Sequence, residues 1–280
     1  MLKYLLLIIL LCINLIILLT FITKFISLKL VCQNTFRDRC FYHPGYYQNL
    51  MKYKQPGFKI TKIYWPKKSQ NIISYSLFGS NPKYFRHLED NIKIIKKELP
   101  EWSIRVYLHD QSSPEFFQKL YNKKIEIHLV HDELVAPRNG AGTFWRLLPL
   151  CENVNSIILD MDDKIDKKNY NKIKDIKKFF NNPNFVLKGR NRWIYPQTHI
   201  LAGCIFKKKE FKLPYNKTFI MNYPHRTFWG ADEVFLTLEV VPHAIKQGLD
   251  INKQPFFIPY FNIKTQGLSS PFPKQLSHSS

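Results

Sequence analysis

The sequence has few cysteines, few glycines and few acidic residues, and these shortages exclude several classes of protein. Five Cys in 280 residues, with no C-x-x-C pair, exclude a disulfide-dense scaffold and the usual zinc sites. Only 10 Gly and 17 Pro exclude collagen-like and low-complexity architectures. The chain is 45% hydrophobic and 15% aromatic, which is too apolar for a disordered basic tail.

Acidic residues number 21 against 42 Lys and Arg, so the formal net charge is +21. The lysines are spread along the chain without a long Arg-rich run. This charge has two interpretations. It is either a general lysine-rich composition or a field that attracts nucleotide phosphates, phospholipid headgroups or nucleic acid.

The N-terminal region contains the one long apolar run of the sequence. Residues 5–22 carry no charge, and their length is close to the ~20 residues that span a hydrocarbon core. No small-residue cleavage site follows, which favours an uncleaved signal anchor over a secretory signal. We therefore expect a single-pass, type II-like membrane protein, in a Golgi, ER or viral membrane context. Its expected parts are an anchor at 1–30, a stem at 31–70, a domain at 71–265 and a polar tail at 266–280.

Two weaker signals concern the compartment of the domain. In a lumenal domain four cysteines could form disulfides, namely Cys32, Cys40, Cys151 and Cys204. The sequon at Asn216 could then carry a glycan. The alternatives are buried free thiols and a chance sequon.

Strand-like and helix-like segments alternate from residue 71 onward. Apolar runs predict strands at 72–78, 103–108, 125–130, 157–159, 185–187 and 200–206. Apolar residues at spacings of three and four predict helices at 80–99 and 168–180, with shorter ones from 113 and over 142–150. This alternation predicts an α/β domain with a mainly parallel central sheet flanked by helices. Ligands of such sheets bind at the carboxyl ends of strands, near a switch in strand order.

An acidic cluster follows the apolar strand 157–159. Asp160 and Asp162 are two residues apart, so on an extended segment their side chains point the same way. Mg²⁺ and Mn²⁺ are typically held by one or two carboxylates together with substrate phosphates. The pattern thus favours a metal–phosphate site, and the alternative is an acidic turn that caps the next helix.

The D-x-D motif and its neighbours resemble a known family. Five segments carry the resemblance: 74–79 (SYSLFG), 144–150 (FWRLLPL), 160–165 (DMDDKI), 202–204 (AGC) and 229–233 (WGADE). In this order they are similar to nucleotide-sugar-dependent glycosyltransferases of the GT-A class, in particular membrane-anchored, viral and bacterial members. The resemblance spans about residues 71–240. It implies a GT-A-like fold, a nucleotide-sugar donor and a glycan, lipid or protein acceptor.

The resemblance also implies roles for individual residues. Six would bind the donor: Tyr75, Phe78 and Gly79 near the base and ribose, Arg146 facing the donor from one helix before the D-x-D, Lys164 where related sequences often carry Arg, and Gly203 facing the sugar. Asp160 and Asp162 would hold Mn²⁺ or Mg²⁺, which stabilises the nucleotide diphosphate as it leaves. Asp232 or Glu233 would reach the acceptor hydroxyl or the sugar, as a general base does in an inverting transfer. The alternatives are a helix N-cap for Asp232 and a surface ion pair for Arg146.

One departure from the family concerns histidine. Enzymes of this class often supply a further metal ligand, commonly His, from near the C-terminus. His225, His243 and His278 are present here, but none lies in a matching motif. Either water and substrate complete the metal site, or this member is weakened or inactive.

Two other functions compete with this interpretation. Phosphatases of the haloacid dehalogenase type also use D-x-D after a strand, with the first Asp as nucleophile and Gly-Thr usually after the second. Here Asp163 and Lys164 follow, and the motif does not open the domain. The third possibility is a non-catalytic, membrane-tethered basic module. We expect no specific nucleic-acid partner, because most aromatic residues fall at core periodicity.

Overall fold

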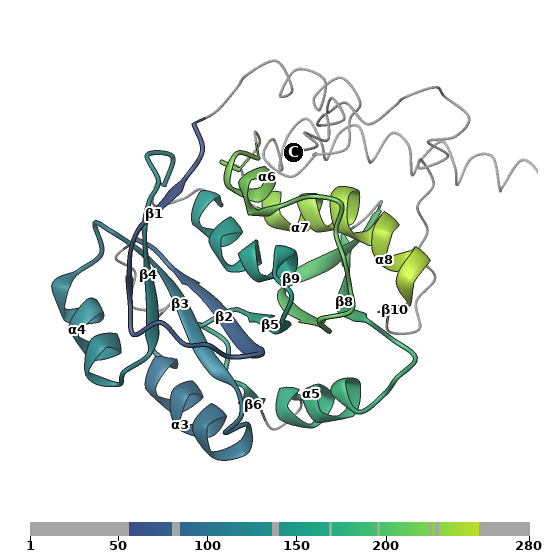
Figure 1. Ribbon diagram of the computed structural model, residues 1–280, viewed down its shortest axis with the longest axis horizontal. Helices are drawn as coiled ribbons and strands as arrows, with labels where there is room; N and C mark the ends of the chain where they lie inside the picture. Colours follow the sequence, from purple (N-terminus) through teal and green to yellow (C-terminus); the bar gives the residue numbers. More distant parts are fainter. Residues whose placement is uncertain are drawn as a thin grey trace, which may run out of the picture.

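A computed structural model describes residues 56–79, 85–135, 140–167, 170–194, 197–223, 226–227 and 230–251. These residues form a layered α/β domain around one eight-stranded sheet (Figure 1). The strand order is β1-β4-β3-β2-β5-β9-β8-β10. In chain order the strands are β1 (Lys59–Tyr64), β2 (Asn71–Leu77), β3 (Ser103–His109), β4 (Glu126–His131), β5 (Asn155–Leu159), β8 (Leu187–Ile194), β9 (Gln197–Lys207) and β10 (Leu249–Ile251).

The centre of the sheet is parallel, as the sequence predicts. Strands β4, β3, β2 and β5 run in the same direction, while β1 pairs antiparallel with β4, and β9 pairs antiparallel with β5 and β8. The order of the parallel strands reverses at β2: β3 and β4 extend from it to one side and β5 lies on the other. The carboxyl ends of β2 and β5 therefore form the switch point at which such sheets bind ligands.

Helices cover both faces of this sheet (Figure 1). One face packs against α3 (Leu88–Glu98), α4 (Pro114–Asn122) and α5 (Lys172–Phe180). The other face packs against the 3₁₀ helix η2 (Ala141–Cys151), α6 (Lys217–Met221), α7 (Ala231–Phe235), the π-helix η3 (Leu236–Val240) and α8 (Val241–Gln247).

Side chains of the parallel strands alternate between these two cores. On β5, Ile157 and Leu159 enter the core under α3, α4 and α5, while Ile158 enters the core under η2. This period of two is the geometry of an extended strand, and it explains why strands buried on both faces appear as continuous apolar runs in the sequence.

Several sequence-predicted boundaries agree with the structure, and others shift. Helix α4 begins as predicted, with the Ser113 hydroxyl accepting a hydrogen bond from the Glu115 amide at 3.3 Å. The predicted helix at 168–180 begins only at Lys172, because a two-stranded sheet of β6 (Asp166–Lys167) and β7 (Tyr170–Asn171) precedes it. The strand predicted at 185–187 begins only at Leu187 and continues to Ile194, where it pairs with β9. Within the expected stem, residues 59–64 form the edge strand β1.

The anchor expected at 1–30 and the tail expected at 266–280 lie outside the described residues, as do Cys32 and Cys40. Among the residues that the structure describes, no helix is long and apolar enough to cross a membrane. Cys151 is a half-buried free thiol, and Cys204 is buried on β9.

Candidate functional site

The candidate site lies at the carboxyl ends of β2 and β5. Asp160 is the first residue after β5, and Phe78 and Gly79 follow β2. Gly79 has a φ of +73°, a left-handed conformation that favours glycine, and the chain turns there. The strand order brings these two strand ends together, although about 80 residues separate them in the sequence.

Two serines of β2 fix the backbone of Arg146 above this edge. The Ser74 hydroxyl donates to the Arg146 carbonyl at 2.9 Å, and the Arg146 amide donates to the Ser76 hydroxyl at 2.9 Å. Residues two apart on a strand point to the same face, so both hydroxyls meet η2. The sequence reasoning assigned no role to these serines, although two polar residues at a spacing of two in an apolar strand are a detectable signal.

The Arg146 side chain joins two carboxylates that are far apart in the sequence. Its Nη1 donates to Asp160 Oδ1 and also to the Leu159 carbonyl at 3.3 Å, and its Nη2 donates to Asp232 Oδ2 at 3.1 Å. The Arg146 side chain is 7% exposed, Asp232 is 6% exposed and Asp160 is 38% exposed. The guanidinium is therefore the buried centre of an Asp160–Arg146–Asp232 triad, and the alternative of a surface ion pair for Arg146 is wrong.

Burial and the neighbouring opposite charges shift the pKa values of Arg146 and Asp232 in opposite directions. For Arg146, burial lowers the pKa, but the charges of Asp160 and Asp232 outweigh it and hold the pKa above its ordinary value. For Asp232, burial raises the pKa above its ordinary value, while Arg146 and a hydrogen bond with Thr143 oppose the rise.

Gly203 on β9 makes room for the Asp160 carboxylate. A Cβ atom at position 203 would lie 1.7 Å from Asp160 Oδ2 and 2.3 Å from Asp160 Cγ, so no other residue fits without displacing the carboxylate. The backbones also meet, since the Asp160 amide donates to the Gly203 carbonyl at 3.4 Å. Gly203 thus positions Asp160 by close approach.

Asp232 and Glu233 lie in the first turn of α7. The helix begins after Gly230, which has a φ of +84°, and Asp232 Oδ1 accepts a hydrogen bond from the Glu233 amide at 3.0 Å. Gly230, not Asp232, is the N-cap residue. Asp232 is buried against Arg146 and Glu233 is half-buried, so α7 brings Asp232 into the triad.

The acidic motif leaves the strand through a turn and is not extended. The chain turns at Met161 and Asp162, and Met161 is buried in the core on the α3 side. Asn91 of α3 holds the end of this turn: its Nδ2 donates to the Asp163 carbonyl at 3.0 Å, and its Oδ1 accepts from the Ile165 amide at 3.1 Å. The premise that Asp160 and Asp162 lie on an extended segment is therefore wrong.

Lys164 and Tyr75 are not members of the triad. Lys164 pairs with Asp90 of α3 at 3.7 Å, at the exposed surface. Tyr75 is fully buried in the core on the α3 side, where burial, with Asp160 adding, raises the pKa of its hydroxyl above its ordinary value. Phe78 is half-buried and packs edge-on against Trp145, with a centroid distance of 5.7 Å. Of the predicted site residues, the contacts unite Asp160, Arg146, Gly203 and Asp232.

The GT-A resemblance implies a divalent metal, and the donor set at this edge is compatible with one. Among the described residues, no group of three or more His, Cys, Asp or Glu side chains could hold a metal ion. However, Mg²⁺ and Mn²⁺ are commonly bound through one or two carboxylates plus phosphates, and Asp160 presents a partly exposed carboxylate with Asp162 two residues on. His243 contacts the Tyr215 ring instead, and His225 and His278 lie outside the described residues.

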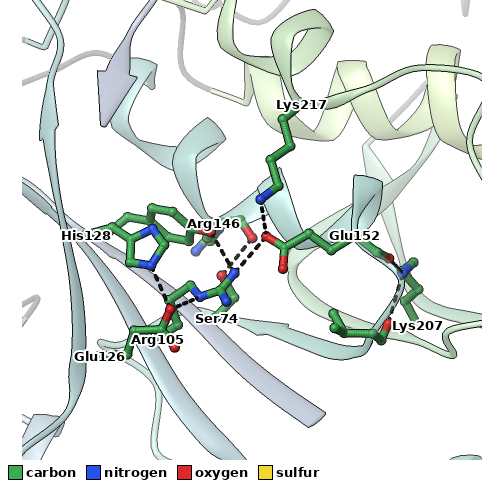
Figure 2. Close-up of polar contacts among 10 residues, drawn as sticks. Ser74, Arg105, Glu126, His128, Arg146, Glu152, Lys207 and Lys217 are labelled. Carbon is green, nitrogen blue, oxygen red and sulfur yellow. Dashed lines mark hydrogen bonds and ion pairs between the residues drawn. The ribbon is translucent and has the colours of Figure 1, made fainter. Parts of the chain in front are cut away.

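A second polar network on the same face of the sheet was missed by the sequence reasoning (Figure 2). Arg105 of β3 bonds Glu126 of β4 at 2.8 Å and Glu152 at 2.7 Å, and Lys217 pairs with Glu152 at 2.9 Å. Arg105 and Glu126 lie toward the amino ends of their strands, opposite the triad. This network ties the end of η2 to the sheet.

A further buried ion pair, between Arg226 and Asp132, lies just after the carboxyl end of β4. Arg226 donates to Asp132 at 2.5 Å and to the Pro56 carbonyl at 2.8 Å, and Trp145 Nε1 donates to Asp132 at 2.9 Å. Because Trp145 precedes Arg146 in η2, this pair fixes the same helix that carries the triad's guanidinium.

Comparisons with known proteins give little further information. No family model and no curated protein matches the chain. One solved structure that is similar over part of its length is a mannosyltransferase from Pyrobaculum calidifontis in complex with GDP-Man and Mn²⁺. The identity is 13% and the TM-score 0.37, and the match covers 60% of this chain and 54% of that chain.

Proposed function

We propose that the protein is a membrane-anchored glycosyltransferase that moves a sugar from a nucleotide-diphosphate donor to a glycan, lipid or protein acceptor. The observation that carries this proposal is the Asp160–Arg146–Asp232 triad at the carboxyl ends of β2 and β5. It combines a buried cation, a partly exposed carboxylate and a buried carboxylate at the switch point of a parallel sheet.

The residues of the triad suit the demands of this reaction. Cleavage of the sugar–phosphate bond develops negative charge on the diphosphate, and a fixed guanidinium binds phosphate oxygens through several N–H donors. One hydrogen bond donated by Ser74 and one accepted by Ser76 hold the Arg146 backbone in place before any substrate arrives. Arg146 therefore binds and orients the leaving diphosphate.

Asp160 and Asp162 would hold a Mn²⁺ or Mg²⁺ ion, which, when bound, neutralises charge on the departing diphosphate. Gly203 keeps the Asp160 carboxylate at the end of β5 by leaving space for it. Phe78 and Gly79, at the end of β2, lie beside this position and would contact the nucleoside.

Asp232 is the candidate proton acceptor for the acceptor hydroxyl. Its burial raises its pKa, and a general base works best when its pKa approaches the working pH. Glu233, adjacent in α7, is the alternative base and is half-buried. The N-terminal anchor would hold the domain at a Golgi, ER or viral membrane.

The test is thermal unfolding of the full chain in detergent with Mn²⁺ and a panel of UDP, GDP and CMP compounds. A ligand at about 100 times its Kd stabilises a protein by ~2.7 kcal/mol, which raises Tm by ~5 to 10 °C for a domain of this size. We expect one nucleotide to give a metal-dependent shift that is lost in Asp160→Asn and kept in Asp175→Asn, an aspartate in the first turn of α5. No shift with any nucleotide would refute a nucleotide-sugar site.

A further inference from the structure

We propose that Arg146 holds Asp160 as an internal counter-ion and that a donor diphosphate frees Asp160 for a divalent cation by taking over the guanidinium. This inference rests on the proposed function, because it concerns the order in which the donor and the metal occupy the same site. It predicts that the metal binds weakly by itself and tightly together with the nucleotide.

The first support is that Asp160 has a positively charged partner within the chain. Arg146 Nη1 donates to Asp160 Oδ1, and the Asp160 Oδ2 atom lies against the backbone of Gly203. A divalent cation seeks the same carboxylate oxygens as the guanidinium. The two cations therefore compete, and Asp160 binds a metal only in the fraction of molecules in which Arg146 has released it.

The second support is an unused donor on the same guanidinium. Arg146 Nε is buried and has no hydrogen-bond partner among the residues that the structure describes, although almost all buried polar groups in proteins have one. An oxygen-rich anion would supply the acceptor. Phosphate groups accept paired hydrogen bonds from arginine, so a diphosphate can use Nε–H together with the Nη2–H on the same edge of the guanidinium, which leaves the second Nη2–H to Asp232. The charge of the diphosphate then draws the guanidinium away from Asp160, which now faces Nη1.

The exchange conserves charge pairing. Before it, Arg146 pairs with Asp160 and the metal pairs with the diphosphate in solution. After it, Arg146 pairs with the diphosphate and Asp160 with the metal. Asp232 stays on Nη2 throughout, so the buried carboxylate keeps a counter-ion and the guanidinium keeps an attachment point. The donor and the metal then strengthen each other's binding by the same factor, as thermodynamic linkage requires.

The experiment measures Mn²⁺ affinity of the full chain in detergent, without nucleotide, from the electron paramagnetic resonance signal of free Mn²⁺. We expect Arg146→Met to bind Mn²⁺ at least about fivefold more tightly than the wild type, the lower end of usual coupling factors. Adding Asp160→Asn to Arg146→Met should remove the gain, which locates the new affinity at Asp160. Equal affinities of the wild type and Arg146→Met would overturn the proposal.

Arg146→Met leaves Asp232 buried without its cation, which can prevent folding. A second pair of variants therefore tests the same point without an unpaired buried charge. Arg146→Met with Asp232→Asn removes both charges and should show the same gain in Mn²⁺ affinity. Asp232→Asn alone should show none, because Arg146 then pairs with Asp160 only. A gain in Asp232→Asn alone would contradict the proposal.

The nucleotide arm separates this inference from the proposed function. In the wild type, the nucleotide that gives a thermal shift should also raise Mn²⁺ affinity at least about fivefold. If nucleotide and Mn²⁺ bind but Arg146→Met leaves the affinity for Mn²⁺ alone unchanged, the counter-ion role fails and the glycosyltransferase proposal stands. If no nucleotide binds, the function and the donor-driven exchange both fail.

Discussion

At the scale of single residues, the site depends on two positions where the surrounding contacts determine which residue fits. Arg146 is the cation that the carboxylates of Asp160 and Asp232 share, and Gly203 is the position where a side chain would overlap Asp160. The sequence identified both as candidates through the family resemblance. It could not show that they act on the same carboxylate, because they lie on different elements.

Gly203→Ala tests the close approach. The new Cβ would lie 1.7 Å from Asp160 Oδ2, so we expect the carboxylate to move, nucleotide binding to weaken and the free energy of unfolding to fall by ~1 to 3 kcal/mol. Chemical denaturation measures the stability. In an Asp160→Ala background the same change should cost much less, since the clashing carboxylate is gone. Equal costs in the two backgrounds would show that the contact with Asp160 does not restrict position 203.

At the scale of elements, η2 is the part that positions the site. It is a 3₁₀ helix of 11 residues with Pro149 inside it, and its backbone is bonded to β2 through Ser74 and Ser76. Runs of 3₁₀ structure this long are uncommon, and tertiary contacts stabilise this one. The sequence predicted a short helix here. Its 3₁₀ type depends on the contacts with Ser74 and Ser76 and on the Arg226–Asp132 pair that Trp145 contacts.

Ser74→Ala tests the attachment of η2 to β2. The Arg146 carbonyl would lose a buried hydrogen bond, so we expect a loss of about 1 to 3 kcal/mol in unfolding free energy and weaker nucleotide binding. Ser156→Ala is the matched control, because Ser156 is equally buried on the neighbouring strand β5 and its hydroxyl has no hydrogen-bond partner in the described part of the chain. Equal losses in both variants would mean that the Ser74 bond does not hold η2.

At the scale of the whole molecule, one sheet face carries buried charges at both ends. The triad lies at the carboxyl ends of the parallel strands, and the network of Arg105, Glu126 and Glu152 lies toward their amino ends (Figure 2). Lys207 of β9 adds a buried ammonium that donates to the Glu152 carbonyl at 2.6 Å and the Val154 carbonyl at 3.0 Å. These bonds join β9 to the chain between η2 and β5.

Lys207 makes the stability of the whole domain depend on pH. Burial lowers the pKa of Lys207 to about 8 from its ordinary value of 10.5. Between these two values the unfolded chain binds the proton and the folded chain does not, so this group raises stability as the pH rises from about 8 to about 10.5. In Lys207→Met we expect this contribution to disappear, which denaturation at several pH values would detect as a smaller slope. An unchanged slope would mean that Lys207 keeps its ordinary pKa.

The sequence by itself determined the fold class, because burial on both faces and helical spacing are local patterns. It predicted the parallel centre, the start of α4 and the strand that ends just before Asp160. It missed most of β8, where Lys188, Gly189 and Arg192 give no apolar pattern and the strand is held by backbone pairing with β9.

Only the tertiary structure decided which candidates meet. Strand order placed Asp160 beside the end of β2, and α7 brought Asp232 to within 3.1 Å of Arg146. The turn at Met161 directed Lys164 toward α3, a result that spacing along an extended strand could not give. The physical reason is that the sequence specifies local backbone preferences and burial, whereas charge pairing depends on side chains that come together only when distant elements pack.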